Sequence, residues 1–139
     1  MTKTYSAQVS GLFDANTDKL AVEITAASGT TVKIKKVRVF HDDGTALVTS
    51  DYHKEVKFVR ESVAGTGGSS YTPIKLDANA AASGATVKTG VFTVGTISDT
   101  IDALSVHSAT DFYWSAVDEE DKIVVLPTGI FGIVLNPAG

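Results

Sequence analysis

The sequence predicts an all-β protein with one domain, a jelly-roll-like β-sandwich that carries a long loop or arm rich in Gly, Ala and Ser. Three observations favour this fold class. Val, Ile, Thr, Phe and Tyr alternate with polar residues in many short runs, which is the period of a half-buried strand. These runs return at roughly 8–14-residue intervals, as they do in sandwiches and jelly rolls. Helix signals are poor, and the 139 residues suit a single domain, residues 1–139.

The first strands are expected in residues 4–9, 20–24 and 32–39, where apolar and polar residues alternate. In the third run the alternation changes parity at Lys35. A β-bulge near Lys35 would supply the extra residue; alternatively, the strand passes there from one sheet to the other. Asp43-Gly44 lies between two apolar runs and therefore predicts a hairpin turn.

Further strand signals fill most of the remaining chain. Gly90 stands in the middle of one of these runs and predicts a bulge or a bend. Residues 77–82 are rich in alanine and suit one or two helical turns. The expected strands are residues 45–48, 55–63, 86–94, 101–106, 111–115, 122–126 and 130–135. The first and last strands of the chain are candidate edges for pairing with another chain.

Residues 67–84 form the longest interruption between strand signals. Pro73 biases the residue before it toward extended structure and has no N–H to donate, so it suits a sheet edge or an arm. Small residues around it allow close approach to a partner backbone. We therefore expect an interaction arm whose anchors are Tyr71, Ile74 and Leu76. The alternative is an ordinary loop that covers one end of its own sandwich.

The sequence offers no constellation typical of an enzyme. It has no cysteine, which excludes a thiol nucleophile, a disulfide and a thiolate metal site. It has no G-x-S-x-G elbow for a serine nucleophile. The glycine-rich residues 65–68 lack the G-K-[ST] ending of a phosphate-binding loop. The protein is therefore expected not to be an enzyme.

Metal and cofactor signals are also weak. Asp14 and Asp18 begin a pattern similar to a calcium loop, but Lys19 and Thr25 stand where that loop needs Gly and Glu. The pattern indicates an Asx-rich turn instead. The three histidines lie on separate segments without ligand spacing: His41, His53 and His107. No metal and no cofactor are expected.

Charge patterning predicts solvated charged strips, or alternatively a contact between copies, rather than nucleic-acid binding. The net charge of −4 gives no general reason to bind nucleic acid or an anionic membrane. No apolar run has the length of a signal peptide or a bilayer span, so a soluble protein made in a cytoplasm is expected. A basic strip, typically a solvated face, could meet an acidic strip on a neighbouring copy. The strips are Lys33, Lys35, Lys36 and Arg38, and Asp118, Glu119, Glu120 and Asp121.

The C-terminal half resembles a group of small virion structural proteins of tailed bacteriophages. The residues that carry the resemblance are Val59-Arg60, Gly67-Gly68, Thr72-Pro-Ile-Lys-Leu-Asp77, Trp114-Ser115 and Leu126-Pro-Thr-Gly129. The first 55 residues carry no matching motif. The group has a closing turn richer in glycine than this one.

The resemblance implies a non-enzymatic capsid decoration, or cement, protein on a β-sandwich. Such a protein would act as a homotrimer on the major capsid protein, at the outer surface of the virion, after synthesis in the host cytoplasm. The alternative is a tail-fibre, head-fibre or glycan-binding sandwich that displays aromatic side chains such as Tyr71 or Trp114. Trp114 is, however, expected in the core more readily than on a ligand platform.

Overall fold

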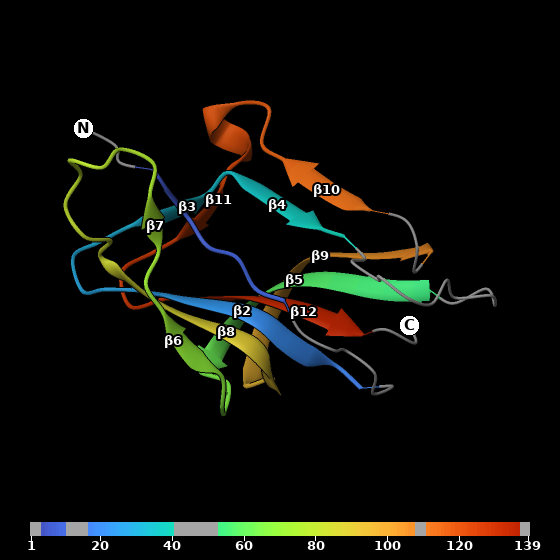
Figure 1. Cartoon of the computed structure of the whole chain (residues 1–139). Helices are drawn as coiled ribbons and strands as arrows, with labels where there is room; N and C mark the ends of the chain where they lie inside the picture. The colour runs from blue at the N-terminus through green and yellow to red at the C-terminus, as the bar shows by residue number, and fades with distance from the viewer. Residues whose placement is uncertain (1–3, 11–16, 41–52, 108–110, 137–139) are drawn as a thin grey trace.

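The computed structural model describes residues 4–10, 17–40, 53–107 and 111–136, and its regular structure is almost entirely β (Figure 1). These residues contain one short 3₁₀ turn, η1 (Glu119–Asp121), and no α-helix. No helix in this part of the chain is long and apolar enough to cross a membrane. The prediction of an all-β protein is confirmed, while the Asp43-Gly44 turn and the strand expected at 45–48 lie outside the described residues.

The largest element is a six-stranded antiparallel sheet with the strand order β6-β8-β2-β12-β5-β9. Its last strand in sequence, β12, lies between β2 and β5. The prediction that this strand is a free edge is therefore wrong. Phe131 to Val134 are buried, so β12 is covered on both faces, which suits a central strand. The strands are β2 (Lys19–Ala26), β5 (His53–Val63), β6 (Ser69–Tyr71), β8 (Ala85–Thr93), β9 (Thr96–His107) and β12 (Ile130–Asn136).

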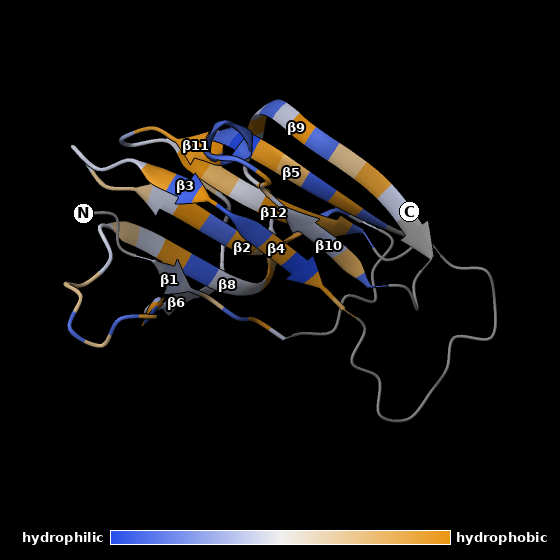
Figure 2. Ribbon diagram, turned by 90° about the horizontal axis from the view of Figure 1, so that it is seen from above, coloured by the Kyte–Doolittle hydropathy of each residue, from blue (hydrophilic) through white to orange (hydrophobic). Residues whose placement is uncertain are grey.

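Four short strands lie over one face of this sheet (Figure 2). β3 (Val32–Ile34) pairs with β11 (Ile123–Val125), and β4 (Lys36–Val39) pairs with β10 (Phe112–Ser115). The chain changes its pairing partner at Lys35, between β3 and β4. Of the two interpretations of the parity change, the structure shows a strand that leaves one ladder for another.

The main hydrophobic core fills the space between the sheet and these four strands. Phe58 of β5 is its centre, because its ring contacts three other aromatic rings. The ring centroids of Phe112 and Trp114 lie 5.7 Å away in edge-to-face geometry, and that of Phe131 lies 6.0 Å away. Trp114 is half-buried against this cluster, as expected for a core residue.

The sheet is strongly curled, because β5 and β9 at one end of the strand order fold over toward β8 near the other end. β8 and β9 are far apart in the strand order, yet only Val94 and Gly95 connect them. Three register irregularities in the β5–β9 pairing bend these strands. Beyond β5 the chain returns to β8, where Thr66 and Thr93 form a bridge. Residues 64–68, which make this return, are called the closing segment below.

A second, smaller core lies inside the curl, on the face away from β3, β4, β10 and β11. Its buried residues are Leu20, Val59, Phe92 and Val134. Gly65 of the closing segment packs so closely here that a Cβ would lie 2.5 Å from Leu20 Cδ1 and 2.4 Å from the Thr93 carbonyl oxygen. Glycine at this position therefore allows the curl to close.

Gly90 confirms the bulge expected in the middle of β8. The register between β2 and β8 shifts beside it, between Leu20 and Val22. Gly90 has a φ of 130°, a conformation that side-chain-bearing residues rarely adopt. The bulge adds local twist to the strand and so contributes to the curl.

Candidate interaction surface

Residues 67–84 form two short strands at one side of the molecule. β6 extends the six-stranded sheet by pairing with β8, and β7 (Ile74–Lys75) pairs with β1 (Tyr5–Ser6). Gly67 and Gly68 direct the chain into β6 with φ values of 97° and 76°, which favour glycine. Figure 1 shows β7 rising from β6 at the side of the sheet.

Hydrogen bonds fasten this arm to its own subunit. The Leu76 N–H donates to the Thr4 carbonyl at 3.1 Å, and the Tyr5 hydroxyl donates to the Ala81 carbonyl at 2.8 Å. At the far end, the Ala27 N–H donates to the Gly84 carbonyl at 3.0 Å. The arm thus has the backbone of an ordered local loop. β1, expected as an edge for another chain, has β7 as its partner.

The predicted anchors of the arm differ in exposure. Ile74 is 49% exposed and Leu76 is 65% exposed, so both present aliphatic surface to solvent. Tyr71 and Pro73 are half-buried. The structure thus shows two outward-facing aliphatic side chains on a fixed backbone.

The helical turns expected in residues 77–82 are absent from the structure, which has a turn there instead. Asp77 organises it: its side chain accepts the Asn79 N–H at 3.0 Å and its carbonyl accepts the Ala80 N–H at 2.9 Å. Asp and Asn side chains that bond nearby backbone favour turns over helix, which overrides the alanine content.

The basic and acidic strips meet within one chain at one point. Lys33 Nζ lies 2.5 Å from Glu119 Oε1, and Lys122 also bonds Glu119. The ammonium group of Lys122, and to a lesser extent that of Lys33, holds the pKa of Glu119 below its usual range. The pair is exposed, so solvent screens it and it adds little to stability. The pairing that the sequence suggested between copies is made here inside one subunit, at Lys33.

The other members of the two strips are solvent-exposed. Lys35, Glu120 and Lys36 face water, and the Lys36 ammonium lies 6.0 Å from the centre of the Tyr113 ring. Asp118 and Asp121 close η1, where the Asp118 N–H donates to Asp121 Oδ2 at 3.2 Å. The acidic cluster is thus a solvated turn.

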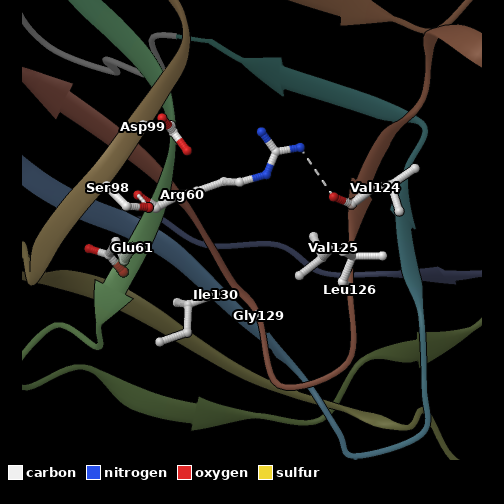
Figure 3. Close-up of a pocket in the computed structure, with 9 residues that line it drawn as sticks. All are labelled: Arg60, Glu61, Ser98, Asp99, Val124, Val125, Leu126, Gly129 and Ile130. Atoms are coloured by element: carbon white, nitrogen blue, oxygen red, sulfur yellow. Dashed lines mark hydrogen bonds between the residues drawn. The ribbon is translucent and has the colours of Figure 1, made fainter.

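A groove of about 510 Å³ lies where the ends of β5 and β9 face β11 (Figure 3). Arg60 points across it, and its Nη2 donates to the Val124 carbonyl at 3.3 Å. Ser98 at its margin donates its hydroxyl to the Arg60 carbonyl at 3.2 Å rather than to a base. The groove contains no histidine among its lining residues, so they form no histidine-based nucleophile pair.

The residues considered for a metal are placed as follows. His53 and His107 are directly opposite each other in the β5–β9 pairing, while His41 and Asp14 lie outside the described residues. Asp18 accepts hydrogen bonds from Lys57 and Asn136, both at 3.1 Å. In the part of the chain that the structure describes, no three histidine or carboxylate side chains form a group that could hold a metal ion.

Sequence reasoning missed a pair of buried carboxyl groups inside the curl. Glu23 of β2 is 2% exposed and Glu61 of β5 is 6% exposed. The Gly65 N–H donates to Glu23 Oε2 at 2.7 Å, and the Gly95 N–H donates to Glu61 Oε1 at 3.0 Å. Burial, and next the neighbouring Glu23 carboxyl, raise the pKa of Glu61 to about 8.

Comparison with known proteins adds no relative to this description. No family model, no curated protein and no solved structure matches the chain. Function is therefore inferred from the residues and contacts of the chain itself.

Proposed function

We propose that this chain is a non-enzymatic bacteriophage capsid decoration, or cement, protein. It binds the major capsid protein on the outside of the head shell as an oligomer, most simply a homotrimer, and stabilises the shell. In this proposal the two packed layers of strands are a β-sandwich of jelly-roll type. The phage-like motifs of the C-terminal half support the assignment.

The observation that carries the proposal is the exposure of Ile74 and Leu76 on a hydrogen-bonded arm. Exposed aliphatic side chains that lie close together mark contact surfaces more often than isolated ones do. The arm is fixed to its own subunit by β1 and β8, so little conformational entropy is lost when it docks. A protein that stabilises a shell needs such a surface and needs no reactive groups.

A second candidate, a tail-fibre, head-fibre or glycan-binding module, is favoured by Tyr113. This ring is 59% exposed on β10, beside Lys36 of β4. Aromatic rings displayed in this way can stack on sugars. Of the two aromatic residues named from the sequence, Tyr71 is half-buried and Trp114 contacts Phe58 in the core, so Tyr113 is the displayed ring in this alternative.

Binding to heads tests the decoration role. Heads assembled from the major capsid protein of the phage that encodes this chain are mixed with the purified protein, sedimented and heated. We expect the protein to sediment with the heads and to raise the temperature at which they disrupt. The double variant Ile74→Ser/Leu76→Ser is expected to bind at least about tenfold more weakly, because it loses the apolar contacts that hold the oligomer together and with them the multivalent attachment to the shell.

The matched control is Leu104→Ser/Val117→Ser, which removes two exposed aliphatic side chains from β9 and from the segment after β10. It should sediment as the unmodified protein does. Failure of the unmodified protein to bind heads would contradict the decoration role and shift weight to the Tyr113 alternative. Equal binding by both double variants would instead contradict the role of the arm.

A further inference from the structure

The buried carboxyl groups of Glu23 and Glu61 lie where the curled sheet closes. They connect the closing segment and the β8–β9 connection to strands β2 and β5. Glu23 accepts from the closing segment at Gly65, and Glu61 accepts from the β8–β9 connection at Gly95. Neither backbone donor belongs to a regular strand. The two side chains therefore act as fasteners between the sheet and the segments that fold over it.

Gly132 lets the two carboxyl groups share this space. It lies on β12 between β2 and β5, opposite Glu23 in one pairing and opposite Val59 in the other. A Cβ at Gly132 would lie 3.7 Å from Glu61 Cδ, and only 2.7 Å from Leu20 Cδ2. The absence of a side chain on the intervening strand leaves room between the two glutamates.

The charges around the pair do not compensate two ionised carboxylates. Lys88 of β8 is the cross-strand neighbour of Glu23 and lowers the pKa of Glu61, but less than burial and Glu23 raise it. The closing segment contributes Ala, Gly and Thr, and β12 contributes aliphatic residues and glycine here. Farther along the same face of β5, Lys57 is paired with Asp18 and Glu55. Two buried carboxylates beside one partly exposed cation cost free energy.

One carboxyl oxygen also lacks a partner. Glu61 Oε2 is buried and has no hydrogen-bond partner in the described structure. An ionised oxygen in this position would carry its full desolvation cost. A protonated oxygen becomes a donor that can turn toward the Glu23 carboxylate, as in carboxyl pairs that share one proton.

We propose that the Glu61 carboxyl holds a proton beside Glu23, and that the two side chains form a latch that holds the closing segment and the β8–β9 connection on the sheet while Glu61 is protonated. Loss of the proton places two negative charges inside the curl and loosens both segments. Because the closing segment leads directly into β6, the arm loses part of its support in the deprotonated state. The inference concerns the fold of one subunit and does not depend on the proposed function.

The sign of the pH dependence follows from the raised pKa of Glu61. The folded chain keeps a proton that the unfolded chain loses near pH 4.5, so this group's contribution to stability is greatest at and below that pH. The contribution is lost as the pH rises toward the folded value of about 8. The latch thus weakens from mildly acidic to mildly alkaline pH, which is opposite to ordinary acid unfolding.

Thermal unfolding of the unmodified chain, Glu61→Gln and Glu55→Gln between pH 5 and pH 8.5 tests the latch. The unmodified chain should lose at least about 5 °C in Tm across this range. Glu61→Gln cannot lose a proton and should lose much less, with a higher Tm than the unmodified chain at pH 8.5. Glu55→Gln removes the same charge from the same face of β5 and should keep the unmodified profile.

Amide hydrogen exchange at Gly65 and Gly95, corrected for intrinsic pH dependence, should show protection that falls over the same range. Equal pH dependence of Tm in the unmodified chain and Glu61→Gln would overturn the proposal. If Glu61→Gln does not fold, infrared spectroscopy of the unmodified chain with isotope-labelled glutamate decides. A protonated carboxyl band at pH 7 supports the latch, and its absence at that pH overturns it.

Discussion

Replacing Gly95 with alanine is expected to lower the free energy of unfolding by about 3 kcal/mol or to prevent folding altogether. A Cβ at this position would lie 1.9 Å from the Val63 carbonyl oxygen and 2.7 Å from the Ala64 carbonyl carbon. Both neighbours are backbone atoms, so a side-chain rotation cannot relieve the overlap. The β8–β9 connection would have to move away from the end of β5, which opens the curl. Urea unfolding followed by tryptophan fluorescence measures the loss.

Gly29→Ala is the control for this substitution. Gly29 has a φ of +76°, and nothing lies within 4 Å of a Cβ built there. Its replacement costs only the strain of a left-handed conformation, about 1 kcal/mol. If Gly95→Ala destabilised the chain no more than Gly29→Ala does, the close approach of the β8–β9 connection to β5 would be wrong.

Replacing Phe58 with alanine is expected to cost about 3–5 kcal/mol of unfolding free energy. The side chain is 1% exposed, and its ring contacts Phe112, Trp114 and Phe131. Two of these rings belong to β10 and one to β12. The cavity that the substitution leaves would therefore lie between β10 and the six-stranded sheet and weaken their packing. The near-ultraviolet circular dichroism of the tryptophan should weaken together with the unfolding midpoint.

Phe40→Ala provides the comparison for Phe58, since Phe40 is 56% exposed and its ring lies beside the Arg38 guanidinium. It should change the unfolding free energy by less than about 1 kcal/mol. A similar loss from both substitutions would mean that the core is not centred on Phe58.

Much of the strand content could be predicted from the sequence, because alternation reports directly which residues face a core. The run at residues 55–63 placed Val56 and Phe58 on one face, and both are buried in the main core. The parity change at Lys35 identified the residue where the strand changes partner. These features depend on residues close together in the chain.

The order of the strands and the curl could not be predicted in the same way. Pairing of β12 with both β2 and β5 depends on residues 69 or more positions apart, and alternation does not show which neighbours a strand takes. The curl depends on irregularities between β5 and β9 that only the pairing reveals. A strand of mixed apolar residues was therefore assigned to an edge although it is central.

The buried acid pair was hidden for the same reason. Alternation places Glu23 on the face opposite Val22 and Ile24, which in a flat sheet faces water. Only the curl turns that face inward and brings Glu61 to it. The extended segment that carries the exposed Ile74 and Leu76 could, in contrast, be predicted from local chemistry, because Pro73 favours an extended edge segment.

The most direct measurement of the central claim, that the arm is an assembly surface, is the solution mass of the chain by light scattering over a range of concentrations. We expect a trimer for the unmodified chain and for Leu104→Ser/Val117→Ser, and a shift to monomers for Ile74→Ser/Leu76→Ser with unchanged circular dichroism. An unmodified chain that stays monomeric at every concentration, or a trimer that the arm substitutions leave intact, would contradict it.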